Sequence, residues 1–175
     1  MSNLRLTQIQ NRLGTNSIQL NTDGTVFPNQ GLDTPYMMVV RAGGYTAADG
    51  ISNILYDVLV HSRRMSHTGG TNMFFEVPGK YLIVTGWRFG SGGDVWTGVR
   101  LLDGATLRGV GFGTGQITND PGPCSIHFIA DIPADRVNIS MQMQFIRAGS
   151  TMGIATPVTP AYGYAIVTTV NYIGR

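Results

Sequence analysis

The stretch GGTNMFFEVPGKYLIVTGW, residues 69–87, decides the fold of this chain. It contains two apolar runs on either side of a Val-Pro-Gly corner. Pro78 ends the first run, because proline has no backbone N–H to donate to a neighbouring strand. Gly79 can adopt the backbone angles that a tight corner requires. The stretch therefore predicts two β-strands joined by a corner.

The run after the corner carries apolar side chains on both of its faces. Side chains alternate along a strand, which places Tyr81 and Ile83 on one side. Leu82 and Val84 then point to the other side. An unbroken apolar run of this length is typical of a strand that is covered on both faces. We therefore expect the sheet that contains it to be covered on both sides.

The composition points to a β-rich globular domain. The chain has 175 residues, which is enough for one domain with its own core, and 42% of them are hydrophobic. Only 13% are charged, about half of the roughly 25% that is usual in globular domains. The 24 glycines are about twice the usual share of roughly 7%. Low charge and high glycine favour many strands joined by tight turns.

The kinds of charged residue suggest an assembly surface. Eleven of the twelve basic residues are arginine, and nine of the ten acidic residues are aspartate. Lys80 and Glu76 are the exceptions. Protein interfaces are depleted in lysine and glutamate and enriched in arginine, methionine and tyrosine. The chain has 8 methionines and 7 tyrosines. We therefore expect extensive self-association or assembly, although strands and turns also avoid lysine and glutamate.

From residue 36 onward, short apolar or alternating runs are separated by turn signals, with no convincing helix. Asp103-Gly104 is a strong hairpin signal. This pattern predicts an all-β fold: an antiparallel β-sandwich or barrel of about eight strands. The expected strands are YMMVVRA (36–42), NILYDVLVHS (53–62), MFFEV (73–77), KYLIVTGWRF (80–89), WTGVRLLDG (96–104), ATLRGVGFG (105–113), SIHFIADI (125–132), RVNISMQMQFI (136–146) and YGYAIVTTVNYIG (162–174).

Residues 1–35 differ from the rest and predict an extended N-terminal arm, with residues 36–175 forming the sandwich. The alternating pieces of the arm are too short to form an independent sheet. Their apolar side chains need another surface to cover them, so we expect the arm to attach to a neighbouring protein. The expected attachment residues are Leu4, Arg5, Leu6, Ile9, Arg12, Ile18, Leu20, Val26 and Phe27.

Several function classes find little support in the sequence. The net charge of +2 and the absence of a basic stripe beyond Arg63-Arg64 disfavour nucleic acid as a partner. No apolar run is long enough to span a membrane, and MSNLRLTQIQ is unlike a signal peptide. Cys124 is alone and the 3 histidines do not cluster. The glycine-rich GVGFGTG (109–115) lacks the following helix of a phosphate site, which favours a flexible or close-packed strand edge. We expect no catalytic, cofactor or metal site.

The order of these pieces resembles the tumour-necrosis-factor-like jelly roll, the fold family that includes the globular head of the complement recognition protein. The resemblance covers roughly residues 36–174. It implies a jelly-roll sandwich and a homotrimer, in which the inner sheet also packs against two identical subunits about a threefold axis. Residues assigned to the core or trimer contact are Phe75, Tyr81, Ile83, Phe145 and Tyr164. The matching residues are Leu55-Tyr56-Asp57-Val58, Thr68-Gly69, Phe74-Phe75, Val77-Pro78-Gly79-Lys80-Tyr81, Ser125 to Phe145, and Tyr164-Ala165-Ile166-Val167.

The arm carries a second resemblance. TQIQNRLGTNSIQL (7–20) is similar to N-terminal segments of tailed-bacteriophage virion proteins. Together the two resemblances imply a non-enzymatic virion protein, made in the host cytoplasm. Our leading hypothesis is a trimeric capsid decoration or cement protein whose arm binds the major capsid protein or another virion protein. The alternative is a tail-fibre tip or receptor-binding protein whose loops, 63–72 and 147–161, contact host glycans. A secreted ligand of the same fold is disfavoured by the absence of a signal peptide.

Overall fold

The structure, a computed structural model, divides the chain into two compact units, Met1–Thr34 and Pro35–Arg175. Each unit is considered by itself. The residues that the structure describes are 8–10, 16–20, 26–28, 34–47, 50–91, 95–115, 123–148, 152–154 and 164–175.

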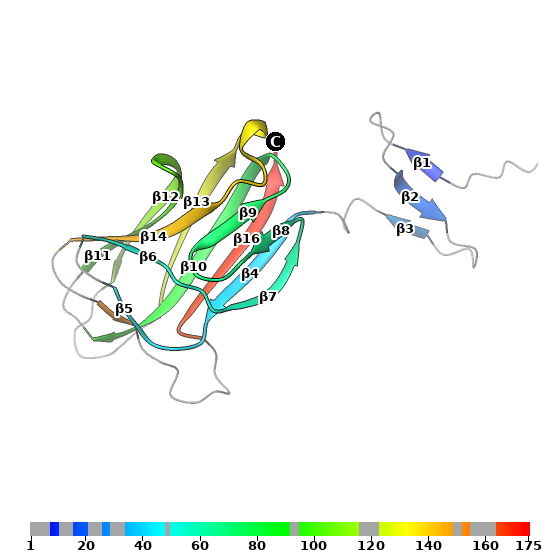
Figure 1. The fold of residues 1–175 in the computed structure, drawn as a ribbon. Helices are drawn as coiled ribbons and strands as arrows, with labels where there is room; N and C mark the ends of the chain where they lie inside the picture. Colours follow the sequence, from blue (N-terminus) through cyan, green and yellow to red (C-terminus); the bar gives the residue numbers. More distant parts are fainter. Residues whose placement is uncertain are drawn as a thin grey trace, which may run out of the picture. The chain divides into compact units, whose positions relative to one another are not determined.

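The first unit contains a small antiparallel sheet of three strands in the order β1-β2-β3 (Figure 1). Ile9 pairs with Ile18, and Leu20 pairs with Val26. The expectation that these pieces would form no sheet of their own is therefore wrong. The central strand pairs along both edges, so the three short pieces satisfy one another's backbone groups. The strands are β1 (Gln8–Gln10), β2 (Asn16–Leu20) and β3 (Val26–Pro28).

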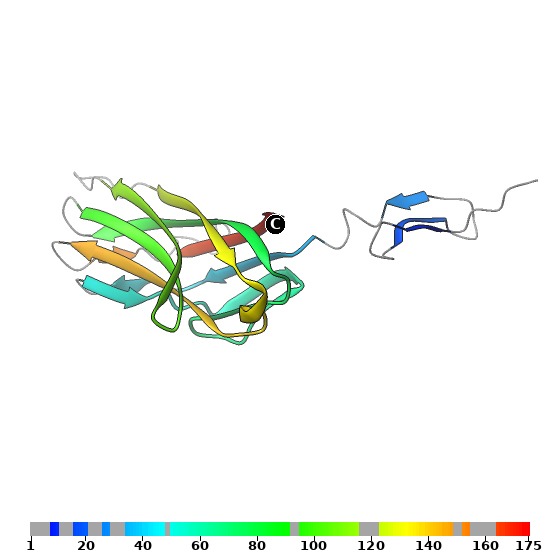
Figure 2. The ribbon, with the colours of Figure 1, turned by 90° about the horizontal axis from the view of Figure 1, so that it is seen from above.

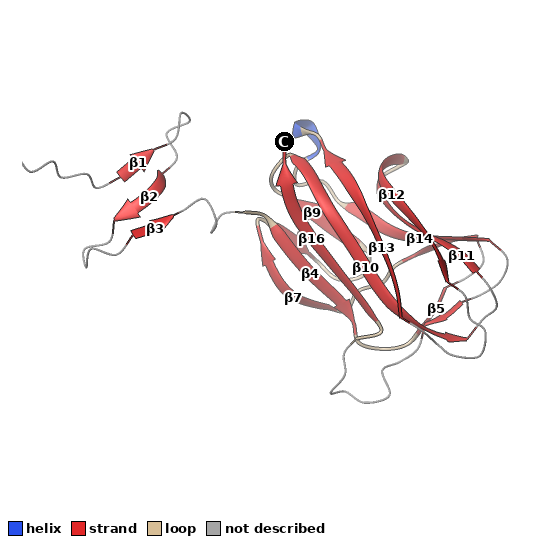
Figure 3. Cartoon of the chain, turned by 180° about the vertical axis from the view of Figure 1, so that it is seen from behind, coloured by secondary structure: helices blue, strands red, loops and turns tan. Residues whose placement is uncertain are grey.

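The second unit is an antiparallel sandwich of two sheets (Figures 1 and 2). Its strands are β4 (Tyr36–Arg41), β5 (Tyr45–Ala47), β6 (Gly50–Asn53), β7 (Val58–Arg63), β8 (Met65–His67), β9 (Asn72–Phe75), β10 (Gly79–Ser91), β11 (Val95–Asp103), β12 (Thr106–Gly115), β13 (Pro123–Ile132), β14 (Met141–Ala148), β15 (Met152–Ile154) and β16 (Ile166–Gly174). A single turn of 3-10 helix, η1 (Ala134–Arg136), is the one helical piece in the described part of the chain (Figure 3).

The two sheets have the strand orders of a jelly roll. The first, called the β10 sheet here, has the order β13-β10-β16-β4-β7, and β15 and β5 continue from the end of β10. The second, called the β14 sheet, has the order β12-β11-β14-β9-β8, with β6 also paired to β14. Apart from the hairpins β8-β9 and β11-β12, the paired strands of these two orders are not consecutive in the chain, as in Greek-key connections. The predicted antiparallel jelly-roll sandwich is confirmed.

The prediction of one continuous strand over residues 53–62 is wrong, because β6 ends at Asn53 and β7 begins at Val58. The chain leaves the β14 sheet after β6 and enters the β10 sheet at β7, and backbone hydrogen bonds show why. The N–H of Ile54 donates to the carbonyl of Met143 in the β14 sheet. Three residues later, the N–H of Asp57 donates to the carbonyl of Val40 in the β10 sheet. The segment between them therefore crosses from one sheet to the other.

Two other segments differ from the sequence prediction. The strand expected from residue 136 begins only at Met141. Asn138 has a left-handed backbone with φ of 59°, which ends any extended run through it. The polar loop expected at 63–72 contains β8, which pairs with β9. The hairpin at Asp103-Gly104 forms as predicted, with Asp103 opposite Thr106 and Gly104 at φ of 57°.

The Val77-Pro78-Gly79 corner joins β9 to β10, and the residues in and next to it fix its shape. Gly79 has φ of 142°, and a Cβ there would lie 2.6 Å from the carbonyl oxygen of Gly174. The hydroxyl of Tyr81 donates a hydrogen bond of 2.6 Å to the carbonyl of Val77 across the corner. Its ring lies edge-on to Phe75, with the centroids 4.9 Å apart. These contacts explain the sequence of the corner.

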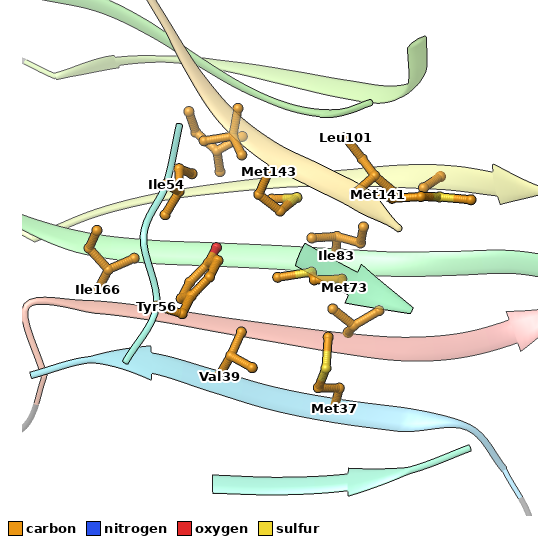
Figure 4. Close-up of a cluster of buried hydrophobic side chains, with 14 of the residues drawn as sticks. Met37, Val39, Ile54, Tyr56, Met73, Ile83, Leu101, Met141, Met143 and Ile166 are labelled. Carbon is orange, nitrogen blue, oxygen red and sulfur yellow. The ribbon is translucent and has the colours of Figure 1, made fainter. Parts of the chain in front are cut away.

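The core lies between the sheets and is built from the inward side chains of both (Figure 4). Phe75, Tyr81, Ile83 and Phe145 are fully buried there, whereas Tyr164 is exposed. The glycine-rich run of β12 meets the backbone of β13 at one edge of the sandwich: a Cβ on Gly111 would lie 2.7 Å from the carbonyl oxygen of His127. The interpretation of this run as a close-packed strand edge is confirmed.

Candidate assembly surface

The β10 sheet is apolar on its outward face as well as on its inward face. Strand register places Leu82 between Asn171 and Ile129, and Val84 between Thr169 and His127. Further rows extend across β16 to β4, where Thr169 lies opposite Met38. We call the following outward residues the assembly face: Tyr36, Met38, Leu82, Val84, Ile129, Val167, Thr169 and Asn171.

The exposure of the two faces of this sheet is very different. The inward neighbours Ile83 and Val170 are completely buried by the β14 sheet. On the assembly face, Ile129 is 54% exposed and Tyr36 is 41% exposed, while Leu82 is half-buried. The sequence predicted cover on both faces. One chain covers the inward face completely and the outward face only in part, for example at Val40, which lies opposite Val167 and is buried.

No member of the assembly face carries a formal charge. Charged side chains lie at its ends: Arg63 on β7 is opposite Tyr36, and Asp131 on β13 is opposite Lys80. His61 and His127 stand at the two ends of the row that contains Val84, and both are exposed. This arrangement of an apolar centre with a charged rim is the usual anatomy of a protein interface.

The edge strand β7 extends the exposed apolar surface. It pairs with β4, and Val58 and Leu59 are both exposed on it. A β-bulge between the pairs of Met38 and Val39 interrupts its register. A β-bulge at a sheet edge hinders the pairing of a strand from another molecule. A partner protein would therefore contact this edge through its side chains more readily than through its backbone.

A carboxyl group with a lowered pKa lies at the β11–β12 hairpin. The side chain of Asp103 is buried and accepts hydrogen bonds from Arg136 and from Arg108, the latter at 2.7 Å. The hydrogen bond from Arg136, together with Arg108, lowers the pKa of Asp103 to about 2. The sequence indicated only a turn-forming aspartate. The structure adds an ion cluster that ties the hairpin to η1.

A second polar group is buried in the core. The hydroxyls of Tyr56 and Thr168 are 2.6 Å apart, and those of Thr168 and Thr85 are 2.9 Å apart. Burial raises the pKa of Tyr56. These hydroxyls satisfy one another across β16 and β10, so they stabilise the core without facing a ligand.

The other predicted site residues are placed as follows. In the arm, Ile9, Ile18, Leu20, Val26 and Phe27 lie on β1, β2 and β3. Their contribution to attachment stays a prediction. Leu4, Arg5, Leu6 and Arg12 lie outside the described residues. Within the described ranges, no three His, Cys, Asp or Glu side chains form a group that could hold a metal ion. No helix there is long and apolar enough to cross a membrane.

Comparison with known proteins supports the fold. No protein-family model matches the chain, and no curated protein sequence matches it. Among solved structures, murine APRIL at pH 5.0 is similar with a TM-score of 0.52 and 10% identity, over 79% of this chain and 98% of APRIL. The PRD1 vertex protein P5 has a TM-score of 0.48 and 14% identity, over 81% and 97% of the two chains. Eiger TNF from S. frugiperda has a TM-score of 0.46 and 9% identity, over 81% and 93%. The expected tumour-necrosis-factor-like jelly roll is confirmed.

Proposed function

We propose that this chain is a structural protein of a bacteriophage virion: a homotrimeric decoration or cement protein that binds the capsid through its N-terminal unit. The observation that carries the proposal is the assembly face. An apolar sheet surface with Ile129 and Tyr36 largely exposed is unfavourable in water and marks a protein contact. A second copy of the same chain is the partner that is always available to cover it.

The oligomeric state in this proposal comes from the sequence resemblance. The tumour-necrosis-factor-like jelly roll that residues 36–174 resemble implies a homotrimer, in which the inner sheet packs against two identical subunits. The assembly face is uncharged at its centre and has Arg63, Lys80 and Asp131 at its ends, so it offers identical copies a surface with the usual anatomy of an interface.

The N-terminal unit supports attachment to a virion. It is a compact unit with a three-stranded sheet of its own. Its sequence is similar to the N-terminal segments of tailed-phage virion proteins. A trimer bound only to the assembled shell would stabilise that shell by mass action. The partner that fits this role is the major capsid protein or another virion protein.

Light scattering tests the trimer. We expect the full chain to give three times its mass of 18.9 kDa, and a truncated chain beginning at Pro35 to give three times its own mass. A monomer in both cases would overturn the proposal.

Attachment to the virion is tested by cosedimentation with phage particles. Replacing Ile18 and Leu20 together by Asp should abolish binding and leave the trimer intact; loss of the trimer would contradict this division of labour.

A further inference from the structure

A row of outward side chains crosses the β10 sheet from β7 to β13 and has a histidine at each end. Strand register places Met38 opposite His61 on one side and opposite Thr169 on the other. Val84 in turn lies opposite Thr169 and opposite His127. We call these five residues the histidine row. Met38, Thr169 and Val84 are half-buried, whereas both histidines are exposed.

The histidine row is narrower than an ordinary protein interface. It spans roughly 19 Å, because its five residues lie on neighbouring strands that are about 4.8 Å apart. A stable interface buries about 800 Å² on each partner, which corresponds to a patch roughly 30 Å across. A second copy that is seated on the centre of the row, at Thr169, therefore also covers the histidines at its ends.

Histidine is the side chain whose ordinary change of charge lies near neutral pH. A neutral imidazole fits an interface, because it carries no charge and its two ring nitrogens can form hydrogen bonds. A protonated imidazole is positive, and burial of a charge without a partner is costly. The histidine row is therefore compatible with a buried contact while its histidines are neutral, and it opposes that contact once they are protonated.

At the β7 end of the row, the formal charges that follow His61 are positive. Arg63 lies two residues further along β7 and faces the same side, and Arg64 follows it in the turn to β8. The carboxylate of Asp57, just before β7, already accepts hydrogen bonds from a backbone N–H. On β4, Tyr36 carries no formal charge. Protonation of His61 would therefore add a further positive charge to this end of the face.

At the β13 end, one acidic side chain faces the same side as His127. It is Asp131, four residues further along β13, which is roughly 13 Å in an extended strand. Lys80 lies opposite Asp131 on β10, and Arg108 of β12, the strand packed along β13, binds Asp103. Exposed charges that are more than about 10 Å apart are largely screened at physiological salt. Asp131 is therefore too distant to neutralise a protonated His127.

From this arrangement we propose that the histidine row makes self-association of the chain depend on pH. Second copies would cover the assembly face near neutral pH and would be released when the row is protonated. The inference rests on the proposed function, because it requires copies of the chain that cover this face. It also names a cause of release that the proposed function does not contain, namely the charge of His61 and His127.

Light scattering of the full-length protein at pH 8.0 and pH 5.5 tests the inference. Ordinary carboxyl groups have pKa values of about 4 and stay ionised over this range, so the charge that changes is carried mainly by histidine. We expect three times 18.9 kDa at pH 8.0 and a mass that falls toward 18.9 kDa at pH 5.5. The double variant, His61→Gln with His127→Gln, should remain a trimer at both values, because glutamine can form hydrogen bonds but cannot gain a charge.

His67→Gln is the matched control, because His67 is the third of the 3 histidines in the chain and lies outside the row. Its Nδ1 atom is 2.8 Å from the carbonyl oxygen of Asn72, and its ring lies edge-on to Tyr56. This variant should dissociate at pH 5.5 as the unsubstituted protein does. Loss of the pH dependence in His67→Gln would assign the effect to the sandwich itself and overturn the inference.

The outcomes separate the inference from the proposed trimer. A monomer at pH 8.0 would overturn both of them, whereas an unsubstituted protein that stays trimeric at both pH values would overturn the inference alone. Dissociation of the double variant at pH 5.5 would also overturn it. If the double variant does not assemble at pH 8.0, the single variants decide: each should shift the midpoint of dissociation to lower pH, and an unchanged midpoint in both overturns the inference. Circular dichroism at both pH values establishes that each variant is folded.

Discussion

The two outward faces of this sandwich differ although the strands behind them are built alike. Both faces are almost free of charge, and both belong to antiparallel sheets that cover the same core. The β10 sheet presents apolar and small polar side chains around Leu82 and Val84. The β14 sheet presents Arg100, Gln144 and Asn53, which are joined by side-chain hydrogen bonds across three strands. A scarcity of lysine and glutamate therefore leaves two different surfaces: one is mainly apolar, and the other carries a hydrogen-bonded polar row.

The largest expected effect comes from placing a charge in the centre of the assembly face. Val84→Asp should convert the proposed trimer to a monomer, because a carboxylate cannot be buried without a partner. Gln144→Asp is the matched control on the other sheet, and it should leave the mass unchanged. Light scattering measures both. Equal masses for the two variants would remove the distinction between the faces.

The second prediction concerns the junction that both sheets share. Gly111→Ala would place a Cβ 2.6 Å from Cγ2 of Ile126 and 2.7 Å from the carbonyl oxygen of His127. Overpacking of this kind typically lowers the free energy of unfolding by about 1–3 kcal/mol. Urea unfolding at a fixed protein concentration measures the change. Gly43→Ala is the control, since no atom lies within 4 Å of its added Cβ. Equal stability of the two variants would show that the β12–β13 junction can open without cost.

The sequence predicted the parts of the fold that depend on local chemistry. The Pro78-Gly79 corner and the Asp103-Gly104 hairpin were identified because proline and glycine restrict the backbone directly. The change of sheet after Ile54 was missed. Apolar residues lie on both sides of Asp57 there, and the crossing is set by hydrogen bonds to Met143 and Val40, which are distant in sequence.

The two outward faces differ in how far the sequence indicated them. The apolar run through Leu82 and Val84 correctly indicated a strand with two apolar faces. The hydrogen-bonded row of Arg100, Gln144 and Asn53 gave no comparable signal, because Gln144 and Asn53 are 91 residues apart. They become neighbours only through the pairing of β14 with β6. In a similar way, the bond between Arg136 and Asp103 spans 33 residues and requires η1 to pack beside the hairpin.

The third effect depends on pH and is expected at the Asp103 cluster on the β14 sheet. Arg136 and Arg108 lower the pKa of Asp103 from an ordinary 3.8 to about 2 in the folded chain. A lowered folded pKa contributes stability above the unfolded value, and that contribution is lost as the pH falls from about 4 to about 2. Asp103→Asn should therefore lower the free energy of unfolding at pH 7 by about 2 kcal/mol. The difference in the free energy of unfolding between this variant and the unsubstituted protein should shrink as the pH approaches 2.

Urea unfolding at pH 7, 4 and 2.5 measures this difference, and Asp135→Asn, at an exposed position, is the control. A difference that stays constant over this range would show that Asp103 acts through the shape of its hydrogen bonds, and that its charge contributes nothing to the attachment of η1.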